Sequence, residues 1–129
     1  MSAKVIEAAY EKFSAGDIEG LLDFMAEDVE WVLPEISGIP FSGARKGRAS
    51  VCAVFDGILG QQDPINFDVD GMVAQGNRVA AFGQYTWQVK ATGRRYAAHW
   101  AHIWTVTEGK ITSFQEYTDR AAAAAAYAT

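Results

Sequence analysis

The stretch HWAHIWTVTEGKITSFQEYTD, residues 99–119, decides the fold. Aromatic, β-branched and other apolar residues fill both of its arms, and the polar turn Glu108-Gly109-Lys110 separates them. This pattern predicts a hairpin of two long strands. The stretch holds both histidines of the chain and two of its four tryptophans. Because Glu116 and Asp119 close the second arm, we expect this hairpin to line any chemical site that the protein has.

The length and charge of the chain restrict its class. It has 129 residues, of which 50% are hydrophobic, so we expect a single domain over residues 1–129 with a substantial core. The net charge is −5. The basic clusters, Arg45-Lys46 with Arg48 and Arg94-Arg95, are too short to form a phosphate-binding patch. We therefore expect no nucleic-acid partner.

The sequence also bears on compartment and membranes. The single cysteine, Cys52, excludes an internal disulfide and fits a reducing compartment. Residues 1–13 carry charges at helical spacing and have no continuous apolar segment, so no signal peptide is expected. No apolar run approaches the roughly 20 residues of a membrane span. The sequence thus predicts a soluble cytoplasmic protein without a membrane partner.

Hydrophobic spacing and turn signals predict helix, helix, strand and helix, followed by four strands joined by hairpins. This order favours an α+β domain whose helices pack on one face of a curved antiparallel sheet. The apolar loop over 35–43 is long for a connector, so we expect it to fold over another part of the chain. The expected helices cover 3–15, Ile18 to Met25 and 47–59, the strands cover 28–33, 65–72, 78–90, 95–107 and 110–118, and the alanine-rich tail over 121–128 can form a short helix.

The long strands are apolar on both faces. Trp100 and Trp104 alternate with Ala101 and Ile103, and the helices can cover only one face of the sheet. The other face needs a different cover. We therefore expect a homodimer that forms through the outer face of the sheet.

Short motifs along almost the whole chain carry a family resemblance. They are Ser14-Ala15-Gly16-Asp17 between the first helices, Ala26-Glu27-Asp28-Val29-Glu30-Trp31, Lys46-Gly47-Arg48, His102 to Ile111, and Glu116-Tyr117-Thr118-Asp119. In these motifs the chain resembles the nuclear transport factor 2-like superfamily, and within it the SnoaL-like branch. That branch includes polyketide cyclases and is close to ketosteroid isomerases and limonene epoxide hydrolases. The resemblance implies a cone-shaped barrel with three helices on the concave face of a mostly antiparallel sheet, around a deep apolar pocket.

This sequence lacks part of the catalytic residues of two related families, the ketosteroid isomerases and the limonene epoxide hydrolases. The position at which ketosteroid isomerases have their aspartate base is Leu33, and the position of their second acid is Ala101. Tyr10 lies within one residue of their tyrosine. The ending over 114–119 resembles that of limonene epoxide hydrolases, with Glu116 at the acid, but residues 78–90 contain no Asp or Glu to complete that set.

The SnoaL-like cyclases resemble the chain best. The resemblance implies one acid–base carboxylate near the end of the last strands, which makes Asp119 and Glu116 the candidates, with His99 as a partner that titrates near neutral pH. Strand alternation puts His99 and Ala101 on one face and His102 on the other. The family pattern makes the first of these the pocket face, so His102 is expected at the subunit interface. The expected pocket wall comprises Tyr10, Trp31, Leu33, Phe41, Phe55, Tyr85, Ala101 and Phe114.

Each candidate also has a structural alternative. Asp119 can cap a tail helix, Glu116 can pair with an arginine of a neighbouring strand, and His99 can be a core or rim residue. No metal site is expected, because His99 and His102 point to opposite faces of one strand.

Three functional hypotheses remain open at this point. The first is a small-molecule enzyme that carries out cofactor-free acid–base chemistry, such as cyclisation, isomerisation or hydration, on an apolar oxygenated substrate. The second is a non-catalytic carrier or sensor with the same pocket. The third is a dimerisation module whose cone is filled by its own side chains.

Overall fold

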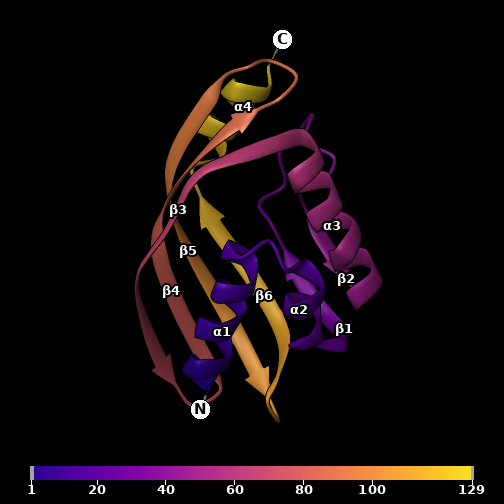
Figure 1. Cartoon of the computed structure of the whole chain (residues 1–129), viewed down its shortest axis with the longest axis vertical. Coiled ribbons are helices and arrows are strands. Elements are labelled where there is room, and N and C mark those ends of the chain that lie inside the picture. Colours follow the sequence, from indigo (N-terminus) through magenta and orange to yellow (C-terminus); the bar gives the residue numbers. More distant parts are fainter. Residues whose placement is uncertain (1, 129) are drawn as a thin grey trace.

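The computed structural model describes residues 2–128 and shows a curved sheet with helices on its concave side (Figure 1). The helices α1 (Ser2–Ser14), α2 (Ile18–Asp23) and α3 (Arg48–Gln61) lie along that side, and α4 (Arg120–Tyr127) lies at one end of the long strands. None of the helices within residues 2–128 is long and apolar enough to cross a membrane. The elements are α1 (Ser2–Ser14), α2 (Ile18–Asp23), β1 (Met25–Val32), β2 (Ala44–Lys46), α3 (Arg48–Gln61), β3 (Gln62–Gln75), β4 (Arg78–Val89), β5 (Arg95–Thr107), β6 (Lys110–Thr118) and α4 (Arg120–Tyr127).

The sheet has six strands in the order β2-β1-β6-β5-β4-β3. All neighbours are antiparallel except β1 and β6, which run parallel. The hairpins β3–β4, β4–β5 and β5–β6 therefore form one continuous wall. The α+β prediction of three helices on the concave face of a curved, mostly antiparallel sheet is confirmed.

The β5–β6 hairpin contains one extra residue. Its turn has positive φ angles of 51° at Glu108 and 78° at Gly109, as a two-residue type I′ turn requires. Val106 then pairs with Ile111, but Thr105 pairs with Ser113. Thr112 is therefore the extra, unpaired residue of a β-bulge. Beyond such a bulge every pair is shifted by one residue.

Two further bulges bend β3, which was predicted only over 65–72. Ile65 and Asp70 have no direct partner in β4, and each extra residue increases the local twist and bend of the strand. At the second bulge the strands approach closely. A Cβ atom on Gly83 of β4 would lie 1.8 Å from the Asp68 carbonyl oxygen of β3, so only glycine fits at this position.

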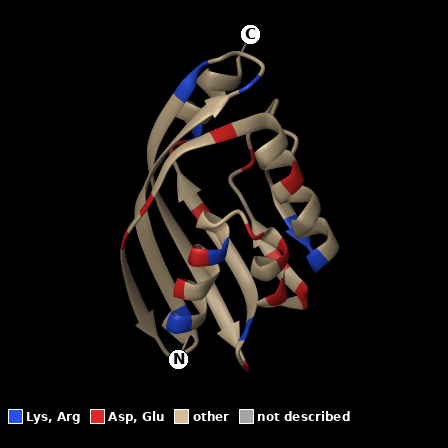
Figure 2. Ribbon diagram, in the orientation of Figure 1, with Lys and Arg blue, Asp and Glu red and all other residues tan. Residues whose placement is uncertain are grey.

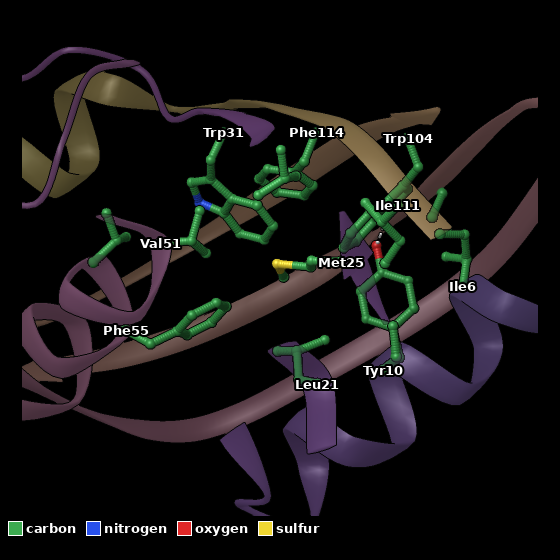
Figure 3. Close-up of a cluster of buried hydrophobic side chains, with 14 of the residues drawn as sticks. Ile6, Tyr10, Leu21, Met25, Trp31, Val51, Phe55, Trp104, Ile111 and Phe114 are labelled. Carbon is green, nitrogen blue, oxygen red and sulfur yellow. Dashed lines mark hydrogen bonds between the residues drawn. The ribbon is translucent and has the colours of Figure 1, made fainter. Parts of the chain in front are cut away.

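The core lies between the sheet and the first three helices. Ile6 and Tyr10 of α1 reach it from one side, and Val51 and Phe55 of α3 reach it from the other (Figure 3). Across the parallel pair β1–β6, Trp31 stacks on Phe114 with a centroid distance of 3.8 Å. Large aromatic side chains thus fill the concave side.

The boundaries near α2 differ from the prediction. Met25 was expected on the second helix, but it begins β1, because the backbone there pairs with β6 through the Ile111 N–H and the Phe24 carbonyl. The short β2 was not predicted. α3 continues past Gly60, which was expected to end it, to Gln61.

Charged residues lie mainly on the helices, β1 and β3 (Figure 2). In β4, β5 and β6 the only Lys, Arg, Asp or Glu residues are the first residue of each strand and Glu116. Glu116 is therefore the one carboxylate in these three strands. The residues around it determine which chemistry it can perform.

We predict that Gly83→Ala destabilises the protein by about 2 kcal/mol or more, because the added methyl group collides with backbone that cannot rotate away. Gly60→Ala is the matched control, since a Cβ there meets nothing within 4 Å. That change should be neutral or stabilise the helix by up to about 1 kcal/mol. Urea unfolding of both variants checks the difference, and equal free energies of unfolding would contradict the close approach.

Candidate functional site

The helices and the concave face enclose a cavity with about 100 Å³ of room for the centres of water molecules. One water needs roughly 10–15 Å³ on this measure, so the cavity accepts several waters or a compact ring. The cone is therefore not completely filled by its own side chains. Its aromatic wall comprises Tyr10, Phe13, Trp31, Phe41, Phe55, Phe67, Tyr85, Trp87, Tyr96, Trp104 and Phe114.

A chain of hydrogen bonds runs along one side of this wall. The Trp104 Nε1–H donates to the Tyr10 hydroxyl at 3.1 Å (Figure 3). That hydroxyl lies 2.6 Å from His102 Nδ1, and His102 Nε2 lies 3.0 Å from Glu116 Oε2. Tyr10 comes from α1, whereas His102 and Glu116 face each other across the β5–β6 pair. The sheet register and the docking of α1 together position the chain.

The partners of His102 determine its tautomer. The Glu116 carboxylate accepts hydrogen bonds only, so the Nε2 atom of His102 carries the proton. Nδ1 then has a free lone pair and accepts from the Tyr10 hydroxyl. Burial lowers the pKa of His102 below 6.5, against the opposing effect of Glu116, so the imidazole is neutral near pH 7.

One oxygen of Glu116 remains free. Thr118 donates its only hydroxyl proton to the His99 carbonyl at 2.9 Å and therefore accepts from the Tyr85 hydroxyl at 3.0 Å. The 3.4 Å approach of Tyr85 to Glu116 Oε2 is the longer of its two contacts. Glu116 Oε1 has no hydrogen-bond partner within residues 2–128, and the Glu116 side chain is 14% exposed and lines the cavity. This oxygen can exchange a proton with a bound molecule.

The neighbouring rings hold these groups in place. His102 stacks on Trp100 at a centroid distance of 4.1 Å and meets the edge of Phe114 at 4.7 Å. Burial raises the pKa of the Tyr10 and Tyr85 hydroxyls, so both remain protonated. No group of three metal-ligating His, Cys, Asp or Glu side chains occurs within residues 2–128.

Comparison with known families decides the classification. The family model described as the SnoaL-like domain matches residues 6–114. The chain belongs to the SnoaL-like family. A search of curated proteins found no significant match.

Solved structures agree with this family assignment. An NTF2-like protein from Burkholderia xenovorans LB400 is 32% identical, with a TM-score of 0.88 over 98% of this chain and 95% of that one. TerC, crystallised together with polyporic acid, is 28% identical, with a TM-score of 0.84 over 98% and 97% of the two chains. A candidate polyketide cyclase from Xanthomonas campestris pv. campestris is 22% identical, with a TM-score of 0.81 over 98% and 96%. The last similarity shows the shared fold alone.

Most of the predicted pocket wall of this SnoaL-like chain does line the cavity. Ala101 is the exception, because it lies on the outer face of β5, opposite in direction to the buried His102. The predicted wall residues that line the cavity are Tyr10, Trp31, Leu33, Phe41, Phe55, Tyr85 and Phe114.

The predicted assignment of faces on β5 was wrong. His99 is exposed on the outer face, and His102, which was expected at a subunit interface, is 4% exposed and lines the cavity. The physical reason is the bulge at Thr112, which pairs His102 rather than Ala101 with Glu116. The structure thus brings Glu116 together with His102 and separates it from His99.

Asp119 lies outside the cavity wall. It is the N-cap of α4, and its Oδ1 atom accepts from the Ala122 N–H at 3.1 Å. This arrangement is the structural alternative raised for Asp119 from the sequence. Gln62 and Tyr96 are cavity residues that sequence analysis missed, since neither belongs to a recognisable motif.

We predict that the free energy of unfolding falls as the pH is lowered through about 6.5, because the unfolded chain protonates His102 there while the folded chain keeps it neutral. The neutral His102 contributes to the free energy of unfolding above that pH, and this contribution is lost as the pH falls toward the lower pKa of His102 in the folded protein. The free energy of unfolding then changes by at most about 1.4 kcal/mol per pH unit. Urea unfolding at several pH values measures it. His102→Gln should reduce the slope and the exposed control His99→Gln should not; an unchanged slope in His102→Gln would refute the buried neutral imidazole.

Proposed function

We propose that the protein is an enzyme that performs cofactor-free acid–base chemistry on an aromatic or otherwise apolar, oxygenated small molecule. The observation that carries this proposal is the free Oε1 atom of Glu116, at the wall of a mostly aromatic cavity, with the other oxygen held by His102. A carboxylate in such surroundings is a general base of fixed orientation. Cyclisation, isomerisation and hydration are the reaction types within its reach.

The proposed proton transfer begins at Glu116. Its Oε1 atom takes a proton from an acidic C–H group next to a substrate carbonyl, and the electron pair moves to the carbonyl oxygen as an enolate; from an acidic O–H group the pair stays on that oxygen. The carboxylic acid that forms then returns the proton to another substrate atom. No electrons are gained or lost overall, so no redox cofactor is needed.

His102 acts as a positioning residue in this scheme. Its Nε2–H donates to Glu116 Oε2 at 3.0 Å and fixes the carboxyl plane, and Tyr10 in turn holds the opposite ring nitrogen. Because both ring nitrogens of His102 are occupied within the protein, we assign the substrate-facing proton transfer to Glu116. The similarity to TerC, which was crystallised with polyporic acid, supports an aromatic oxygenated ligand.

A non-catalytic carrier is the second candidate. The aromatic wall would bind an apolar molecule whether or not Glu116 exchanges a proton with it, and only turnover distinguishes the two functions.

We predict that Glu116→Gln lowers proton exchange at least about 100-fold, because the amide cannot accept the proton. The assay follows deuterium incorporation at the α-carbon of 2-tetralone in D2O by NMR. Asp119→Asn is the matched control, since asparagine caps helices as well as aspartate does, and its rate should equal that of the wild type. A loss of exchange in Asp119→Asn but not in Glu116→Gln would contradict the assignment, and binding of 2-tetralone without accelerated exchange would favour the carrier.

We also propose that two copies of the chain associate through the outer face of the sheet. Phe82 and Tyr117 are 46% and 53% exposed there, and Ala101 and Ile103 lie between their strands on the same face. Apart from the strand ends, this face of β4, β5 and β6 carries no Lys, Arg, Asp or Glu, so two copies can meet without burying a charge.

We predict a species of twice the 14.0 kDa chain mass in sedimentation at micromolar concentration. Ile103→Lys should shift the protein toward the monomer, because it places a charge in the proposed interface. Lys110→Glu, at the end of the hairpin, is the control and should leave the dimer intact. A wild-type protein that sediments at 14.0 kDa would exclude the dimer.

A further inference from the structure

Gln62 is a buried polar residue that the proposed proton transfer does not use. It is the first residue of β3, directly after α3, and only 2% of its surface is exposed. Its side chain lines the same cavity as Glu116. An amide in a mostly aromatic wall is costly to bury unless its hydrogen-bonding groups find partners.

Two tyrosines hold one end of this amide. Gln62 Oε1 lies 3.1 Å from the Tyr96 hydroxyl and 2.5 Å from the Tyr127 hydroxyl. The 2.5 Å separation lies at the short end of the O–H···O range and below the N–H···O range. The atom between the tyrosines is therefore the amide oxygen, and both hydroxyls donate to it.

The other end of the amide has no protein partner. Nε2 carries two N–H groups, and neither forms a hydrogen bond within residues 2–128. Within the same residues, the fully buried side-chain nitrogen and oxygen atoms without a hydrogen-bond partner are Nε1 of Trp31 and Nε1 of Trp100. Nε2 of Gln62 is not among them, so it is not fully enclosed by protein. Since the Gln62 side chain lines the cavity, its N–H groups are available to a molecule inside it.

Gln62 and Glu116 are linked along the wall by two tyrosines. Tyr96, which bonds to Gln62, meets the ring of Tyr85 edge to face at a centroid distance of 6.3 Å, and Tyr85 approaches Glu116. The cavity thus offers a carboxylate that accepts a hydrogen bond or proton and a separate amide that donates hydrogen bonds. A single purely apolar molecule would leave both groups unsatisfied.

We propose that Gln62 is a specificity-determining residue that binds an acceptor oxygen, such as a carbonyl, on an aromatic ligand whose acidic O–H or C–H group faces Glu116. This inference rests on the proposed function and adds the substrate class: an aromatic ring with a proton donor at one position and an acceptor oxygen at another. The tyrosine bonds to Oε1 orient the amide so that Nε2 points to the ligand. A role limited to fastening α4 through Tyr127 would need only the acceptor oxygen.

The test compares two phenols of similar shape, 4-hydroxyacetophenone and 4-ethylphenol, which differ in the carbonyl oxygen. NMR titration of the wild type should show about tenfold tighter binding of 4-hydroxyacetophenone, the effect of one buried hydrogen bond. Gln62→Glu keeps the size and the tyrosine acceptor but replaces the amide donor, so the preference should disappear. Gln62→Met serves the same purpose if the glutamate variant does not fold.

Tyr127→Phe is the control, because it removes a hydrogen bond to Gln62 Oε1 and leaves Nε2 unchanged; it should keep most of the preference. Equal binding of the two phenols to the wild type, or a preference that survives in Gln62→Glu and Gln62→Met, would overturn the role of Gln62. If 4-ethylphenol still binds and Glu116→Gln still slows 2-tetralone exchange, the proposed function stands without this inference. If neither phenol binds and 2-tetralone exchange is not accelerated, both proposals fail.

Discussion

The arrangement of the site depends on one extra residue in β6. A two-residue turn at Glu108 without a bulge would pair Ala101 with Glu116, but the extra residue Thr112 shifts the register so that His102 lies opposite Glu116. Directly opposite residues of an antiparallel pair share a face. The Thr112 hydroxyl donates to the Thr105 carbonyl at 3.3 Å within the bulge. The register of one hairpin therefore determines which histidine meets the carboxylate.

Burial of His102 imposes the second constraint. A buried polar atom without a partner costs about 1–3 kcal/mol, so both ring nitrogens need hydrogen bonds. Glu116 and Tyr10 supply them from different elements, and Trp104 completes the chain by donating to Tyr10. The same bonds that satisfy the core leave one oxygen of Glu116, a residue of the cavity wall, without a hydrogen-bond partner in residues 2–128. Structural stability and the proposed chemistry thus rely on the same residues.

The sequence predicted most of the helices and strands, and most of the residues expected in the pocket do line the cavity, because these features depend on local patterns. Spacing and turn residues located the helices and the hairpins, and aromatic residues such as Trp31 and Phe114 were expected in the pocket and line it. Local patterns did not predict which face of β5 lines the cavity. His99 and His102 lie on opposite faces, and both faces also carry apolar residues. The bulge at Thr112 has no residue that marks it in the sequence.

The position of Gln62 depends on tertiary structure as well. Its partners Tyr96 and Tyr127 are 34 and 65 residues away in the chain. No sequence motif predicts such contacts, because they form only when β3, β5 and α4 pack together. Glu116, by contrast, was a candidate from the sequence, because it closes the second arm of the hairpin and the family resemblance implies a carboxylate near the end of the last strands.

The most direct measurement of this arrangement is the 15N NMR spectrum of the His102 ring near pH 7. We predict a neutral imidazole with its proton on Nε2 and an unprotonated Nδ1 that accepts a hydrogen bond from Tyr10. A proton on Nδ1 of a neutral ring, or a doubly protonated imidazolium, would contradict the hydrogen-bond chain and the assignment of Glu116 as the free base.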